Sequence, residues 1–99
     1  MVMKTYELNV FQKAKKQRRG DAYFPQELVG ERIAYWIEED FNAGKKVPYG
    51  FLNIQARYTY GGTVYLSVKL IGKKIVVMKM EDYHEYRQAE TDIIKRQLQ

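Results

Sequence analysis

The densest group of chemically active side chains in this sequence is a basic segment in the first quarter of the chain. Five cations, Lys13, Lys15, Lys16, Arg18 and Arg19, lie within seven residues. Lysine and arginine neutralise phosphates and release condensed counterions, which supplies most of the sequence-independent affinity of proteins for nucleic acids. The segment therefore predicts contact with RNA, DNA or a nucleoprotein. The alternative is a solvated loop that keeps the protein soluble.

A second group of polar side chains alternates with apolar ones in the middle of the chain. Its members fall on the outward side of two expected strands: Asn53, Gln55, Arg57, Tyr65 and Lys69. An aromatic ring beside cations and amides can stack on a base and hold its backbone. We expect Arg57, Tyr65 and Lys69 to bind nucleic acid together with the basic segment, although Tyr65 also suits simple cross-strand packing.

A third group, Lys79, His84 and Arg87, has the functional groups for RNA cleavage by general acid, general base and phosphate stabilisation. One helical turn does not point all the side chains of residues 83–87 in one direction, and a lone histidine at a helix start is usually structural or exposed. The remaining catalytic signatures are missing, because the sequence has no phosphate-binding glycine loop and its one serine, Ser67, lies in an expected strand. We therefore favour a binding protein over an enzyme.

The composition excludes several other classes of protein. The chain has no cysteine and one histidine, which removes disulfides and thiolate sites and makes a zinc site improbable, so we expect no metal and no cofactor. It contains no apolar run of the roughly 20 residues that span a bilayer, and Lys4 interrupts the amino-terminal end before any apolar signal region. We expect a cytoplasmic protein of net charge +5 that avoids membranes.

All these groups must be positioned by one small domain, residues 1–99. Residues 5–11 alternate between apolar and polar, as in a half-buried strand, and are followed by a basic stretch over about 12–21 that is either a loop or a short exposed helix. Pro25 suits the first turn of a helix. A helical stripe then predicts a helix over about 25–43 with a left-handed cap near Gly44; the stripe consists of Val29, Ile33, Trp36, Ile37 and Phe41.

Three more strands and a helix are expected after that helix. Residues 51–60 and 63–71 alternate, and the parity of their inward positions predicts a three-residue or bulged turn around Gly61 and Gly62. Residues 75–80 are apolar at nearly every position, which is typical of a strand inside a sheet, and helical spacing begins at Asp82. The fold class is α+β in the order β-α-β-β-β-α, with a mainly antiparallel sheet of about four strands packed against helices.

Three acidic residues would lie at an unfavourable place in this arrangement. Glu38, Glu39 and Asp40 fall near the carboxyl end of the expected helix, where the helix dipole disfavours anions. We expect Lys45 and Lys46 to compensate them within the same molecule.

The region from Gly62 to Arg96, with two amphipathic strands, a tight turn and a helix rich in His, Tyr and Arg, resembles the ending of RelE-type messenger-RNA interferases. That resemblance implies a small basic ribosome-dependent toxin, but Gly62-Thr63-Val64-Tyr65 lacks the arginine usual two positions before the tyrosine. The same element order also resembles ribosome hibernation factors. Because the chain resembles both, the resemblance assigns neither family and transfers no site residue.

A protein partner is the third alternative. The chain has nine tyrosines, and tyrosine gives a large contact area at little entropic cost. This composition suits an inhibitor or adaptor of the kind encoded by mobile elements, which docks on a host protein.

Overall fold

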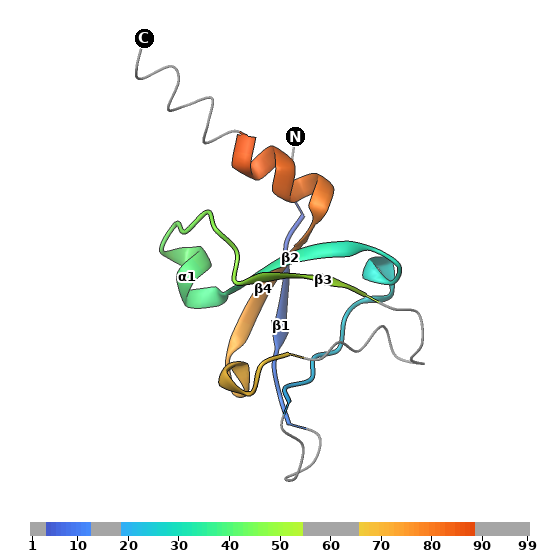
Figure 1. Ribbon diagram of the computed structural model, residues 1–99, viewed down its shortest axis with the longest axis vertical. Helices are drawn as coiled ribbons and strands as arrows, with labels where there is room; N and C mark the ends of the chain where they lie inside the picture. Colours follow the sequence, from blue (N-terminus) through green and yellow to red (C-terminus); the bar gives the residue numbers. More distant parts are fainter. Residues whose placement is uncertain (1–3, 13–18, 55–65, 89–99) are drawn as a thin grey trace.

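Four antiparallel strands form the framework of this protein in a computed structural model that describes residues 4–12, 19–54 and 66–88 (Figure 1). The strands are β1 (Tyr6–Asn9), β2 (Arg32–Ile37), β3 (Gly50–Asn53) and β4 (Lys74–Lys79). The helical elements are the short turns η1 (Gln26–Leu28) and η2 (Val68–Leu70), helix α1 (Glu38–Asn42), and a helical segment over residues 80–88. The sheet order is β1-β4-β2-β3, so the predicted α+β class with a four-stranded antiparallel sheet is confirmed.

Strands β2 and β4 are the inner strands, and each has four consecutive buried residues. Such a run is expected where both faces of a strand are covered. Tyr35 is paired with Val77, and Trp36 with Val76. The prediction that residues 75–80 form an interior strand is therefore confirmed.

Strand β1 follows its predicted alternation, with Tyr6 buried and Glu7 exposed. Beyond the strand, the Val10 amide donates to the Lys73 carbonyl and the Gly72 amide donates to the Val10 carbonyl. Gly72 has a φ of 83°, a left-handed conformation that glycine adopts without steric cost. This glycine turn leads the chain into β4.

The helix predicted over 25–43 is wrong, because this region contains η1, β2 and α1 in succession. Apolar residues at Ile33, Trp36 and Ile37 fit one side of a helix, but they fit a strand buried on both faces equally well. In β2, Ile33 and Ile37 lie on one face and Trp36 on the other. The element order β-α-β-β-β-α still holds with η1 as the first helical element, and α1 is a short addition between β2 and β3.

The strand predicted over 63–71 is wrong in its described part. Leu66 forms only an isolated bridge with Gly20, and Val68–Leu70 form η2. The Ser67 hydroxyl caps this turn by accepting a hydrogen bond from the Lys69 amide at 3.2 Å, which favours a helical turn over continued strand. The turn predicted at Gly61 and Gly62 lies outside the described residues.

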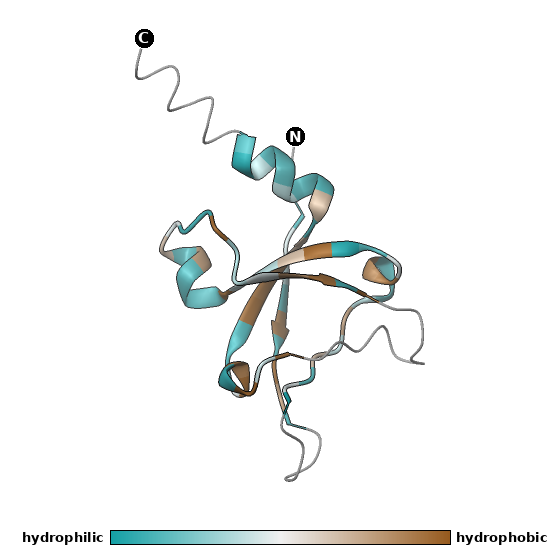
Figure 2. Cartoon of the chain, in the orientation of Figure 1, coloured by the Kyte–Doolittle hydropathy of each residue, from teal (hydrophilic) through white to brown (hydrophobic). Residues whose placement is uncertain are grey.

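Two apolar clusters cover the two faces of the sheet. We call the first cluster the aliphatic core. It contains residues of the four strands or their flanks and of the segments that connect them. Its buried members include Val10, Phe24, Leu28, Ile33, Ile54, Leu66, Leu70, Ile75 and Val77. The second, which we call the aromatic cluster, consists of Ala34, Trp36, Met78, Tyr83 and Tyr86 with Phe41 and Met80 at its margin. Apolar residues accordingly concentrate on the strands, whereas the helical segment 80–88 is mostly hydrophilic (Figure 2).

Candidate nucleic-acid interface

The basic segment lies only partly within the described structure. Lys13, Lys15, Lys16 and Arg18 lie outside the described residues, whereas Arg19, the last cation of the segment, and Gln12, which precedes the segment, are described. Just outside the two ends of the segment, the backbone amides and carbonyls of Phe11 and Asp21 exchange two hydrogen bonds, at 2.9 and 2.8 Å. This pair brings the two ends of the basic segment together at one end of the sheet.

The same end of the molecule carries two further lysines. Gly20 and Leu66 exchange backbone hydrogen bonds of 2.8 and 3.1 Å, and Val10 is bonded to Lys73 as described above. These contacts place η2, which carries Lys69, and the turn that carries Lys73 beside the two ends of the basic segment (Figure 1). We call Arg19, Lys69 and Lys73 the basic end.

The cations of the basic end differ in their surroundings. Arg19 Nε lies 3.8 Å from Asp21 Oδ1, and the Asp21 side chain is only 3% exposed. A buried carboxylate needs such a partner, so Arg19 has a structural use in neutralising Asp21. Lys69 and Lys73 are exposed, and no carboxylate of the described chain lies within ion-pair distance of either.

The predicted outward sheet face is not assembled within the described residues. Arg57 and Tyr65 lie outside them, and Lys69 lies in η2 rather than on a strand. Asn53 is on β3, where its Oδ1 accepts a 3.4 Å hydrogen bond from Arg32 Nη1. Arg19 and Lys69 are the predicted nucleic-acid-binding residues that the structure describes; it places them near each other and adds Lys73.

The candidate cleavage residues lie toward the opposite end of the molecule, at and beyond the end of β4. His84 and Arg87 are exposed on the helical segment 80–88, whose buried side chains Tyr83 and Tyr86 pack on Trp36. Acid–base catalysis benefits from a site that excludes water, which these exposed positions do not provide.

Lys79, the other cleavage candidate, influences a nearby carboxylate. The pKa of Glu27 lies below its usual value chiefly because Lys4 hydrogen-bonds to its carboxylate, and the charge of Lys79 adds to this effect. Lys79 thus acts on the Lys4–Glu27 ion pair through its charge, without an ion pair of its own among the described residues.

The acidic residues of the expected helix occupy a favourable position instead of an unfavourable one. Helix α1 begins at Glu38, so Glu38, Glu39 and Asp40 lie in its first turn, where the positive end of the helix dipole favours anions. Lys45 Nζ lies 3.3 Å from Asp40 Oδ1, so the predicted compensation by Lys45 is confirmed. Lys46 instead lies over the Tyr86 ring, 3.7 Å from its centroid.

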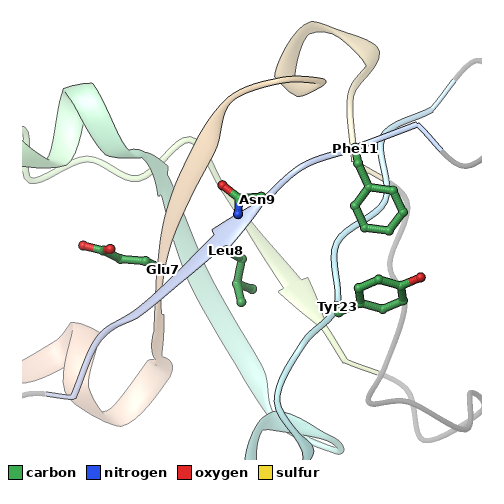
Figure 3. Close-up of a pocket in the computed structure, with 5 residues that line it drawn as sticks. All are labelled: Glu7, Leu8, Asn9, Phe11 and Tyr23. Carbon is green, nitrogen blue, oxygen red and sulfur yellow. The ribbon is translucent and has the colours of Figure 1, made fainter.

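Sequence reasoning missed a cavity of about 420 Å³ at the outer edge of β1. It is lined by Glu7, Leu8, Asn9, Phe11 and Tyr23 (Figure 3). The rings of Phe11 and Tyr23 lie 4.9 Å apart at an angle of 37°, and Tyr23 is 55% exposed. A detectable signal was Phe11 itself, an aromatic residue on the polar parity of its strand.

Two further properties of the described residues bear on the chemistry. No three histidine, aspartate or glutamate side chains among them gather as ligands for a metal ion. Within the same residues, no helix has the length and apolar character required to cross a bilayer.

The chain shows no significant similarity to any protein-family model, curated protein or solved structure.

Proposed function

We propose that this protein binds nucleic acid, with the basic end and the adjoining basic segment contacting phosphates. The observation that carries the proposal is the backbone pairing of Val10 with Lys73 and of Gly20 with Leu66. Through these contacts, Lys69 and Lys73 lie beside the two ends of the basic segment. That segment adds four more cations, Lys13, Lys15, Lys16 and Arg18. A chain of phosphates is the ligand that best matches cations gathered from separate parts of a sequence.

The exposed lysines of the basic end make no ion pair with the described residues. Lys45 and Lys74 lie within 4.0 Å of carboxylates, at Asp40 for the first and at Glu7 and Glu38 for the second. Lys69 and Lys73 face no carboxylate of the described chain. Their positive charge is therefore available to an anionic partner.

The test is a titration of nuclease-treated protein against labelled RNA and DNA at several salt concentrations. The variant Lys69→Gln/Lys73→Gln removes two phosphate contacts, so the slope of log K against log[salt] should become shallower by about 2. Near 0.1 M salt the affinity should fall roughly 10- to 100-fold. Replacing Lys15, Lys16 and Arg18 with glutamine should have a larger effect of the same kind, and Arg19 is kept because it neutralises the buried Asp21 carboxylate.

The matched control is Lys4→Gln/Lys45→Gln, which removes the same charge from positions that pair with Glu27 and Asp40. It should leave the salt slope unchanged. An equal loss of affinity in both double variants would show that only net charge matters. Absence of binding to RNA and DNA at low salt would contradict the proposal and direct the search to a protein partner.

A further inference from the structure

We infer that the cavity at the outer edge of β1 holds one unstacked nucleobase of a single-stranded nucleic acid. The inference rests on the proposed function, because the basic end would hold the phosphates next to that base. It adds the class of nucleic acid that the protein prefers and the residues that recognise it.

The backbone creates the cavity by separating two segments that begin as a pair. Phe11 and Asp21 are hydrogen-bonded to each other, but Ala22 and Phe24 are buried in the aliphatic core. The segment after Asp21 therefore turns away from the edge of β1, while Tyr23 remains exposed. Figure 3 shows the Phe11 and Tyr23 rings beside each other, with Glu7, Leu8 and Asn9 following along β1.

The backbone of β1 also faces this cavity. Val10 uses its amide and carbonyl to bond toward β4, and the groups of successive residues in an antiparallel strand point to alternate sides. The amides and carbonyls of Glu7 and Asn9 therefore point away from β4, to the side of β1 that pairs with no other strand of the described sheet. They add donors and acceptors to a site with an aromatic wall.

The lining has the chemistry of a base site and not of a phosphate site. Aromatic faces such as that of Tyr23 stack on any base, and carboxylate and amide side chains such as Glu7 and Asn9 accept hydrogen bonds from exocyclic amino groups. The Glu7 carboxylate lies 3.8 Å from Lys74 Nζ, so the lining carries no uncompensated positive charge that would select a phosphate. The cavity volume lies within the range typical of small-ligand sites, about 300–1,000 Å³.

The position of the cavity points to a polyanion that carries flat neutral groups. Phe11 lies two residues before Lys13, where the basic segment begins, and its neighbour Val10 is hydrogen-bonded to Lys73. A strand of phosphates crossing the basic end would thus bring its bases to the Phe11–Tyr23 pair. Bases within a duplex are already stacked and paired, so only a single strand can offer one without the cost of extrusion.

The experiment compares Tyr23→Ala with wild type on single-stranded and duplex oligonucleotides of equal length, in RNA and DNA. Loss of one base–aromatic stack should weaken single-strand binding by about 5- to 150-fold. Duplex affinity and the salt slope should not change, because no cation is removed. The matched control is Tyr49→Ala, which truncates another exposed tyrosine, 45% exposed and paired with Tyr35 at 5.5 Å, and should leave binding unchanged.

A second pair of variants guards against a folding defect in Tyr23→Ala. Tyr23→Phe keeps a ring to stack on a base and should bind single strands like wild type, whereas Tyr23→Leu should bind them weakly. Equal binding of single strands and duplexes, unaffected by Tyr23→Leu, would overturn the base site and leave the basic end intact. Equal losses on duplex and single strand would also overturn it. No binding to either ligand at low salt would overturn the proposed function itself.

Discussion

The two faces of the sheet are covered in different ways. On one face, the aliphatic core draws residues from η1, η2 and the segment 20–24 as well as from the strands. On the other face, the aromatic cluster is supplied by β2, β4, α1 and the helical segment 80–88. Trp36 lies at its centre, 1% exposed, with ring centroids of Phe41, Tyr83 and Tyr86 between 5.5 and 5.9 Å away.

The difference teaches how the basic end is held in place. The aliphatic core anchors Leu66 and Leu70, which flank Lys69, and so it fixes the position of the basic end. The aromatic cluster anchors Tyr83 and Tyr86 and leaves His84 and Arg87 exposed. Damage to the first cluster should therefore affect the proposed interface, and damage to the second should affect the helical segment.

The largest expected effect is that of Trp36→Ala. Removing the central ring takes away the contacts of three other aromatic residues, and truncation of a buried tryptophan costs about 3–5 kcal/mol. The free energy of unfolding, measured by denaturant titration, should fall by this amount. A loss below about 1 kcal/mol would show that the aromatic cluster is not a core.

The variant Trp36→Phe sharpens this prediction by keeping a ring. Trp36 Nε1 is buried and has no hydrogen-bond partner in the described structure, so replacing indole by phenyl removes an unsatisfied donor. The cost of the smaller ring is thereby partly offset. The loss should be clearly smaller than that of Trp36→Ala, and an equal loss would mean that the cluster depends on the indole nitrogen.

The same tryptophan explains where sequence reasoning failed. Apolar residues spaced three and four apart define a helical stripe only if the opposite side is polar. In β2, Tyr35 and Ala34 are also buried, and together with Ile33 and Trp36 they cover both faces of a strand. The pattern of β4 was unambiguous because residues 75–78 are apolar without interruption, whereas the glutamates around β2 imitated the polar side of a helix.

The candidate site was predictable in its charge and not in its shape. The cations of the basic segment are visible in the sequence, but the proximity of Lys69 and Lys73 to that segment depends on hydrogen bonds between residues 46 and 63 positions apart, Gly20 with Leu66 and Val10 with Lys73. The cavity beside Tyr23 arises because the chain leaves the edge of β1 after one bridged pair. Local periodicity holds no information about where such a departure occurs.

A smaller effect is expected at Gly20, where the aliphatic core closes against the basic end. A methyl group added there would lie 2.6 Å from Val10 Cγ1 and 3.3 Å from the Ser67 carbonyl oxygen. Overpacking of this kind costs about 1–3 kcal/mol. Gly20→Ala should therefore lower the free energy of unfolding in a denaturant titration.

The contact with Val10 provides the control for that variant. In a Val10→Ala background the clashing methyl group is gone, so Gly20→Ala should cost much less than it does in wild type. Equal costs in the two backgrounds would show that Val10 does not set the fit. The nucleic-acid affinity of Gly20→Ala should also fall, because the shift displaces the flank of the basic segment.

The smallest effect concerns the ion pair at the margin of the aliphatic core. Lys4 Nζ lies 2.8 Å from Glu27 Oε2, and this contact lowers the pKa of Glu27 from 4.5. A depressed carboxyl pKa stabilises the folded state above the unfolded-state pKa, and the stabilisation is lost as the pH falls through the folded-state pKa. Between about pH 6 and about pH 3, wild type should therefore lose slightly more stability than Glu27→Gln.

The aromatic cluster supplies the contrast, because at its margin Lys46 lies over the Tyr86 ring and not beside a carboxylate. Lys46→Gln should accordingly lower the free energy of unfolding by the same amount at both ends of this pH range. The Glu27 effect should vanish in about 1 M salt, since the pair is exposed and such pairs are screened. An acid dependence that is identical in wild type and Glu27→Gln would show that the ion pair does not hold η1 against β1 in solution.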